Sequence, residues 1–485
     1  MKKSTNWSSI YIATVLAFCT GIQFSLYFTS MWPFLERVDK HVTERFYSYV
    51  IVSFSIAQCF SAPIFGYWSN IIRQITVPMY AGIFSMIFGN MVYLSIEAFP
   101  GYERYGMMIG RFFIGIGFSN IVLLKTYSST ACVAEDRSRA VAFINGAISL
   151  GVTLGPGLQL LFTPFGYPGV EIFGRLSINM YTAPAYAACL FNIGCALLMA
   201  CCFKESYAGI VGEGDDVGVV VEDLANDEDL PKIDKIGVVV CNLTKFAKEF
   251  YFANIESIAA PFAMTVFAFT NEETVKYSSI MQTCQGVISF ASFSIYLSCS
   301  LDKLISLRIL VKCGLTVLFA FFIVTFAWPF YSGSLITFSN HDLLNGTAST
   351  VGCNKDKFTW CETLKPVNPW IYYCAFAICT GVGMPYVETS NSAIYGNVLG
   401  PRRQGTMQGV MQFHGGLARI AGPLLVAQLY ATVGPVAIWS MCLVVLGFTI
   451  SLWVVFNKRM PEQKAGKKEE LIYSLSNHAF DKNEV

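Results

Sequence analysis

The sequence predicts an all-α membrane protein with twelve transmembrane helices arranged in two six-helix halves. The first observation behind this prediction is composition, because 54% of the 485 residues are hydrophobic and only 13% are charged, against about a quarter in soluble proteins. The second is a series of apolar windows of roughly 20 residues, the length that crosses the hydrocarbon core as a helix. The third is an internal repeat of glycine and proline motifs. The composition excludes a soluble enzyme, and the net charge of +1 gives no reason to expect nucleic acid as a partner.

Twelve apolar windows follow one another along the chain. Each must form a helix, because an isolated strand would leave its backbone groups unpaired in lipid. The first follows Lys2 and Lys3 and is too long for a signal peptide, so we expect it to be retained. The predicted spans are residues 9–31, 46–68, 78–97, 105–125, 141–162, 179–203, 247–269, 278–300, 309–329, 370–398, 407–430 and 435–456.

A polar break separates the sixth span from the seventh. It contains an acidic run with no apolar face to bury, which is typical of a linker. The run consists of Glu222, Asp223, Asp227, Glu228 and Asp229. The predicted domains are a first half at 1–203, an acidic cytosolic linker at 204–244, a second half at 245–456 with a loop at 331–368, and a tail at 457–485.

The loop at 331–368 indicates how the protein lies in the membrane. An even number of spans places both termini on one side, and a modest excess of lysine and arginine on that side makes it cytosolic. The loop on the opposite side contains the sequon Asn345-Gly-Thr347 and the pair Cys353 and Cys361, which suit an oxidising lumen. We therefore expect a glycan on Asn345 and a disulfide between the two cysteines.

Glycosylation tests this orientation directly. Treatment of the protein from native membranes with an N-glycosidase is expected to increase its gel mobility, and Asn345→Gln should abolish the shift, because the acceptor amide is lost. A wild-type protein whose mobility does not change would contradict a lumenal loop.

A repeat relates the two halves. Gly115-Ile-Gly117 is followed forty residues later by Gly155-Pro156, and Gly381-Val-Gly383 is followed forty-one residues later by Gly422-Pro423. The fourth and fifth spans therefore correspond to the tenth and eleventh. Two halves related by parallel repeats are the plan of many transporters, which place their site near the midplane between the halves.

Three motifs in the first half of the chain carry a family resemblance. Gly151-Val-Thr-Leu-Gly155-Pro156 resembles the fifth-span signature of the major facilitator superfamily, and Arg111 with Gly115 and Gly117 resembles its fourth-span arginine motif. The segment 66–73 is similar to the superfamily's loop between spans two and three, although Asn70 stands where an acidic residue is usual. The resemblance implies the major facilitator superfamily fold with twelve transmembrane helices.

Further segments resemble a particular subfamily, the lysosomal one of major facilitator superfamily domain-containing protein eight, which is linked to neuronal ceroid lipofuscinosis. These segments are Met31-Trp-Pro-Phe-Leu, Ala62-Pro-Ile-Phe-Gly-Tyr-Trp-Ser-Asn70, Ile178-Asn-Met-Tyr-Thr-Ala-Pro184, the Cys353/Cys361 pair and Arg419-Ile-Ala-Gly-Pro423. The resemblance covers essentially the whole membrane region. It implies a multi-pass protein of the lysosomal membrane and suggests endolysosomal chloride transport.

Ionisable residues inside spans are the candidates for the substrate or ion pathway, because a charge near a span centre costs about 2.5–3.5 kcal/mol on insertion scales. Arg111, Glu256, Glu388 and Arg419 are such residues. In the superfamily, spans one, four, seven and ten line the cavity, so the resemblance implies that Arg111, Glu256 and Glu388 face one another. A carboxylate there is able to exchange a proton and couple it to solute.

Structural alternatives remain open for each of these residues. Arg111 is also explained by a side chain that snorkels to the lumenal headgroups. Glu388 is also explained by helix capping or contact with pore water, and Arg419 by pairing with a helix carbonyl. His414, beside two glycines, is more typical of a packing or hydrogen-bonding residue.

The glycine–proline pairs are predicted to be conformational motifs. Gly151, Gly155 and Gly422 permit close helix approach, and Pro156 and Pro423 free a backbone carbonyl, which suits helices that bend or rock. No nucleotide-binding loop, zinc-ligand cluster or nucleophile elbow is found in the sequence, so we expect no cofactor, no metal site and no enzyme activity.

Three functions fit the sequence. The first is a secondary transporter that moves a small solute or anion by alternating access, with proton coupling as an option. The second is a chloride-permeable, channel-like protein of the same fold, and the third is a membrane scaffold or sensor without transport. The expected partners are the lipid bilayer, a small-molecule or anion substrate and protons. Fold alone does not choose between these functions.

Overall fold

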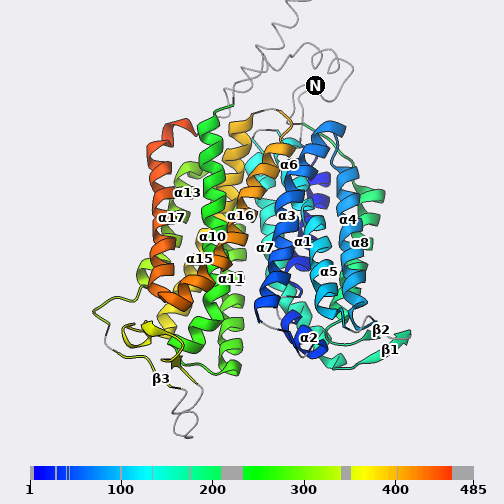
Figure 1. The fold of residues 1–485 in the computed structure, drawn as a ribbon. Helices are drawn as coiled ribbons and strands as arrows, with labels where there is room; N and C mark the ends of the chain where they lie inside the picture. The colour runs from blue at the N-terminus through cyan, green and yellow to red at the C-terminus, as the bar shows by residue number, and fades with distance from the viewer. Residues whose placement is uncertain are drawn as a thin grey trace, which may run out of the picture.

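The protein is described here by a computed structural model, in which helices cross a common slab side by side (Figure 1). The structure describes all residues except 1–4, 28–29, 40, 43, 99–100, 134, 174–175, 209–232, 332, 340–350, 401 and 461–485. Within these limits each of the twelve predicted spans coincides with a long helix or, for the fourth, with two consecutive helices. The all-α prediction is confirmed.

The N-terminal half contains the first six spans and a small sheet. Its helices are α1 (Trp7–Ser25), α2 (Met31–Val38), α3 (Glu44–Ile72), α4 (Thr76–Leu94), α5 (Glu103–Phe118), α6 (Asn120–Thr130), α7 (Arg137–Phe162) and α8 (Ala183–Cys202). Strands β1 (Val170–Phe173) and β2 (Leu176–Ile178) form an antiparallel hairpin. Neither α2 nor the hairpin was predicted, since both are too short to show as apolar windows. The fourth span is divided at Ser119, whose hydroxyl shares a hydrogen bond of 2.6 Å with that of Ser61.

The C-terminal half repeats the six-span plan. Its helices are α10 (Lys235–Val266), α11 (Asn271–Ser298), α12 (Leu301–Leu304), α13 (Leu307–Val324), α15 (Pro369–Leu399), α16 (Gly405–Thr432) and α17 (Pro435–Val455), and its strands are β3 (Thr337–Phe338) and β4 (Cys353–Asn354). Helix α10 already begins at Lys235, within the segment 204–244 that was predicted as the linker. Asp234 caps it by accepting hydrogen bonds from the Ile236 and Gly237 amides.

Three of the twelve spans are less apolar than the others. Nine helical segments of the described chain qualify as membrane spans by length and composition, and α10, α11 and α16 are not among them. They carry charges such as Glu256, Glu273 and Arg419. Each half has its own apolar core. Helices α10, α11 and α16 contact the other half or line the space between the halves.

The two ends of the bundle differ. The start of α1 and the end of α17 lie at one end, called the terminus end, and α2, the β1–β2 hairpin and the loop at 331–368 lie at the other, called the loop end (Figure 1). Cys353 and Cys361 form the predicted disulfide. Asn345 lies outside the described residues.

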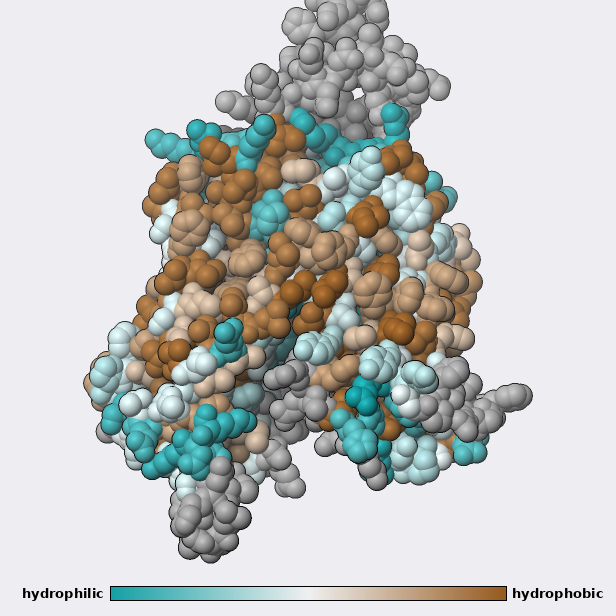
Figure 2. Space-filling view, in the orientation of Figure 1, coloured by the Kyte–Doolittle hydropathy of each residue, from teal (hydrophilic) through white to brown (hydrophobic). Residues whose placement is uncertain are grey.

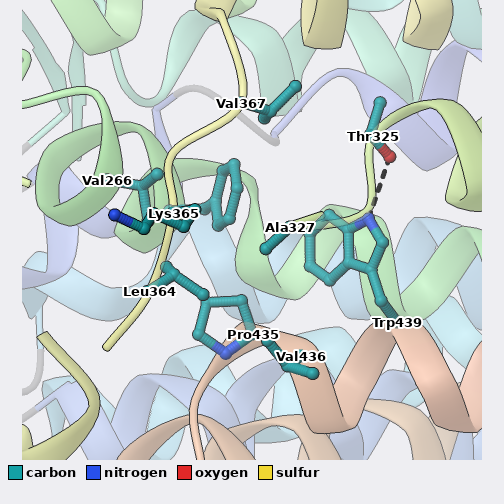
Figure 3. Close-up of a pocket in the computed structure, with 10 residues that line it drawn as sticks. Val266, Thr325, Ala327, Leu364, Lys365, Val367, Pro435, Val436 and Trp439 are labelled. Atoms are coloured by element: carbon teal, nitrogen blue, oxygen red, sulfur yellow. Dashed lines mark hydrogen bonds between the residues drawn. The ribbon is translucent and has the colours of Figure 1, made fainter. Parts of the chain in front are cut away.

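The disulfide loop is anchored to the C-terminal half. The Trp360 ring packs on Gly434, and its indole N–H donates to the Tyr430 carbonyl at 2.8 Å. Beside it is a small pocket in which Trp439 donates to the Thr325 hydroxyl at 2.9 Å (Figure 3). This pocket is lined by residues of the C-terminal half alone, so it is not part of the space between the halves.

Candidate functional site

Helices α3 and α16 join the two halves along a line of small residues. A Cβ added at Gly66 would lie 2.1 Å from the Gly405 carbonyl oxygen, and one at Gly409 would lie 2.7 Å from the Ala62 carbonyl oxygen. Farther from the terminus end, a Cβ at Gly416 would lie 2.8 Å from the Cys59 Cβ. The two backbones are therefore in direct contact from the terminus end to the middle of the bundle.

Helices α7 and α11 form the second contact between the halves. The hydroxyls of Ser138 and Tyr296 are 3.1 Å apart at the terminus end. Toward the middle, Gly146 packs on the Phe293 ring, and a Cβ at Gly286 would lie 2.1 Å from a side-chain carbon of Thr153. This contact reaches about as deep as the first one.

Polar side chains close the terminus end between these helix pairs. Asn70 accepts a hydrogen bond from the Gly405 amide at 3.0 Å and donates to the Thr406 hydroxyl at 2.8 Å. The Arg137 guanidinium donates to the Asn397 side chain at 2.9 Å across the halves. Asn70 replaces the usual acidic residue with a neutral amide, and it still caps the first residues of α16.

The halves are parted at the loop end. Figure 2 shows the surface hollowed between the two lobes at this end, with the halves in contact above it. The structure is thus closed toward the terminus end and open toward the loop end.

Arg111 and Arg419 approach the middle of the molecule from opposite halves. Arg111 of α5 is 2% exposed, and its guanidinium lies 4.6 Å from the centre of the Phe54 ring. Arg419 of α16 reaches across to α1, where its guanidinium lies 4.6 Å from the centre of the Phe24 ring. Because Arg111 is buried between rings, it does not snorkel to the headgroups.

The Arg111 guanidinium retains unused hydrogen-bond donors. Its Nε and Nη1 atoms have no hydrogen-bond partner among the described residues. A buried guanidinium without partners is costly, so such a group is expected to bind an anion or ordered water. Cation–π contacts with Phe54 and Tyr27 stabilise its charge but leave the N–H edges free.

Glu256 is the carboxylate associated with these arginines. Its side chain is exposed although it lies inside α10, a membrane helix, and it interacts electrostatically with both Arg419 and Arg111. Exposure inside a span, next to two buried or half-buried cations, places Glu256 on the wall of the space between the halves. We call Arg111, Arg419 and Glu256 the central triad, which carries a net charge of +1.

Glu388 lies in a different group. On α15 it accepts hydrogen bonds from Lys245 at 3.0 Å, from Lys248 at 2.6 Å and from Lys125. Glu249 joins the same group, with Lys245 at 3.0 Å and Lys248 at 2.8 Å. We call these five residues the ionic cluster.

The expectation that Glu388 faces Arg111 and Glu256 is therefore not met in this conformation. The charges that act on Glu388 come chiefly from the three lysines, whereas those that act on Glu256 come from the central triad and Glu249. The ionic cluster lies nearer the terminus end, since Lys245, Lys248 and Glu249 precede Glu256 along α10, which starts at that end.

The remaining sequence candidates lie at helix contacts. The His414 ring nitrogen Nδ1 is 2.8 Å from the Val410 carbonyl of its own helix, which supports a hydrogen-bonding role. Gly151 and Gly155 face α1, and Gly422 faces Asn254 of α10. Pro423 lies inside α16. These glycines allow helices of one half to pack closely against each other.

Two glycines of α7 provide a matched test. A Cβ at Gly155 would lie 2.0 Å from the Ser25 hydroxyl, whereas one at Gly157 would meet nothing within 4 Å. We expect Gly155→Leu to lower transport by about tenfold or more, because overpacking costs about 1–3 kcal/mol, and Gly157→Leu to retain it. Uptake per inserted protein, with surface expression measured in parallel, checks this. Equal uptake by the two variants would show that the α1–α7 approach is not required.

Comparisons with known proteins agree with this architecture. A sequence model of the Major Facilitator Superfamily matches residues 13–352. The chain is 28% identical to major facilitator superfamily domain-containing protein 8 of Xenopus laevis, over 94% of this chain and 92% of that protein.

Two solved structures share the fold. The crystal structure of the human organic anion transporter MFSD10 (TETRAN) superposes with a TM-score of 0.66 at 17% identity, covering 92% of this chain and 99% of that one. That of the transporter FucP in the outward conformation gives a TM-score of 0.62 at 12% identity, covering 92% and 98%.

Proposed function

The chain belongs to the Major Facilitator Superfamily, and on this premise we propose that it is a carrier that moves a small anion across a membrane by alternating access. The observation that carries the proposal is the central triad, in which Arg111 and Arg419 come from opposite halves and lie against Phe54 and Phe24, whose ring centres are 5.5 Å apart. Two donor atoms of Arg111 have no partner among the described residues. An anion bound between them contacts both halves. Its binding therefore depends on their relative position, as alternating access requires.

Charge supports an anion over a cation or a neutral solute. The triad has two guanidinium groups and one carboxylate, so its net charge is positive whether or not Glu256 is protonated, and a bound anion reduces that charge. Guanidinium groups bind carboxylate and phosphate oxygens in a bidentate manner. The anion class thus includes carboxylates and phosphates as well as chloride.

Glu256 supports proton coupling. When its carboxylate is ionised, it competes with the substrate for the same two arginines. Protonation removes this competition, so proton binding and anion binding favour each other, and the linkage is reciprocal. The protein is accordingly proposed to be a proton–anion symporter.

The closed terminus end supports a carrier over an open channel. The contacts of Asn70, Arg137 and the ionic cluster join the halves at that end, and a channel needs a path open at both ends. A scaffold that transports nothing would not need the hollow between the halves at the loop end, so this hollow also supports a carrier.

The proposed location is the lysosomal membrane, with the terminus end in the cytosol and the loop end in the lumen. The subfamily resemblance and the 28% identity to the Xenopus laevis relative support it, as does the disulfide between Cys353 and Cys361. An acidic lumen would then drive protons and the anion together toward the cytosol.

Purified protein in lipid vesicles tests the proposal. Uptake of radiolabelled chloride, lactate, succinate and phosphate is compared with that of glucose and lysine, which are uncharged and cationic controls. We expect saturable uptake of at least one anion and none of the controls. A current that does not saturate would favour the chloride-permeable channel, and no anion flux at all would contradict both.

A further inference from the structure

The ionic cluster crosses the interface between the halves. Lys125 lies on α6 of the N-terminal half, whereas Lys245, Lys248 and Glu249 lie on α10 and Glu388 on α15 of the C-terminal half. Lys125 donates to Glu388 across the interface. The five side chains are between 4% and 13% exposed, so the cluster is buried.

The charges of the cluster divide unevenly between the halves. Three ammonium groups and two carboxylates give a net charge of +1. The C-terminal half holds two lysines and two glutamates, and its share is therefore neutral. The single remaining charge is Lys125, and the charged groups that act on it are Glu388, Lys245 and Lys248, all on the other half.

Opening of the terminus end must therefore separate Lys125 from Glu388. The C-terminal share stays balanced, with Glu388 still bonded to Lys245 and Lys248. Lys125 loses its partner, and a buried cation without one is strongly unfavourable. The closed conformation is thereby favoured until another anion reaches Lys125.

The transported anion is suitably placed to be that partner. Lys125 lies on the same span as Arg111, about 21 Å farther toward the terminus end at 1.5 Å per residue. An anion released from the central triad toward the terminus end passes along this span and replaces Glu388 at Lys125. An empty carrier has no such replacement.

We propose that the inter-half pair of Lys125 and Glu388 makes anion transport that starts from the terminus end depend on exchange, because the protein opens readily at that end only when an anion is available to replace Glu388 at Lys125. The inference rests on the proposed anion transport and adds to it the mode of transport. Net flux from the terminus end to the loop end requires the empty carrier to reopen at the terminus end, so it is slower than exchange, whereas proton-coupled net flux in the opposite direction restores the pair and is not slowed.

The test uses two double variants with the same change in charge. Lys125→Gln with Glu388→Gln removes the inter-half pair. Lys248→Gln with Glu249→Gln removes a pair that lies within one half, 2.8 Å apart on α10. Both leave the cluster with a net charge of +1, and neither leaves a lone buried charge that would prevent folding by itself.

The measured quantity is the efflux of radiolabelled chloride from vesicles in which the terminus end of the protein faces the interior, with and without chloride outside. We expect the wild type to show a large ratio of exchange to net efflux. The Lys125/Glu388 variant should lower this ratio by about tenfold, which corresponds to about 1.4 kcal/mol in the barrier to opening of the empty carrier at the terminus end, while the Lys248/Glu249 variant keeps it. An unchanged ratio in the first variant, or an equal fall in both, overturns the proposal.

Disulfide cross-linking at the terminus end gives a readout that needs no substrate. Asn70→Cys with Thr406→Cys places two thiols where side chains are now 2.8 Å apart, and mass spectrometry measures their cross-linking yield in each background. We expect a lower yield with the Lys125/Glu388 variant and an unchanged yield with the control. If the wild type transports no anion, the proposed function fails, yet an unchanged yield in the first variant would still separately overturn the role of the pair.

Discussion

Replacing Arg111 with glutamine is expected to lower anion transport at limiting substrate by roughly ten- to a hundredfold. Hydrogen bonds to charged groups contribute about 1.5–3 kcal/mol, and each 1.4 kcal/mol is about a factor of ten. Two donor atoms of Arg111 have no partner in the part of the chain that the structure describes, so glutamine removes both the charge and the donors that a bound anion would use. The effect should fall mainly on the KM for the anion, because binding to the open conformation is weakened.

A second arginine of the same helix provides the control. Arg104 also lies on α5 but is paired with Asp39 at 2.8 Å and is 33% exposed. Arg104→Gln should therefore leave the KM unchanged, and Arg111→Lys should retain part of the affinity, since it keeps the charge without the fork of donors. If Arg111→Gln takes up the anion with the same KM as the wild type, Arg111 has no role in substrate binding.

The twelve spans could be predicted because their signal is local. A window of about 20 apolar residues is sufficient evidence of a span, and the repeat of Gly115 and Gly155 in Gly381 and Gly422 gave the pairing of the halves. The start of α10 at Lys235 was missed because the predicted span was bounded at residue 247, next to Lys245, although Lys248 and Glu249 already lay inside it. Their charges are tolerated inside the protein because they are paired with one another and with Glu388.

The central triad and the ionic cluster differ in how far a sequence can reveal them. Arg111, Glu256 and Arg419 stand out as isolated charges in apolar spans, which the cost of burial makes conspicuous. The partners of Glu388 depend on depth and on the relative position of the halves. Lys125 on the fourth span and Glu388 on the tenth have opposite charges on spans that the resemblance places at the cavity. That combination was a usable signal for the inter-half pair.

The proposed proton coupling depends on the position of Glu256 beside the two arginines. The surface is hollowed between the halves at the loop end (Figure 2). Glu256 is exposed and interacts electrostatically with Arg111 and Arg419. In the proposed mechanism, protons and substrate reach the same site from the same side. If the Glu256 carboxylate competes with the substrate for the two arginines, a pH gradient drives substrate accumulation only when the protonation state of Glu256 changes during transport.

Replacing Glu256 with glutamine is expected to abolish anion accumulation driven by a pH gradient while preserving exchange of labelled for unlabelled anion. Glutamine has nearly the same size but binds no proton, and it no longer competes for Arg111 and Arg419, so the KM for the anion should fall or stay the same. Both activities are measured in the same vesicles, with acid imposed on the loop-end side. Glu362→Gln, which neutralises an exposed carboxylate of the loop at 331–368 that is paired with Lys355, should leave both activities intact. Full pH-driven accumulation by Glu256→Gln would exclude Glu256 as the coupling group, and the loss of both accumulation and exchange would indicate that this residue supports the structure of the site instead.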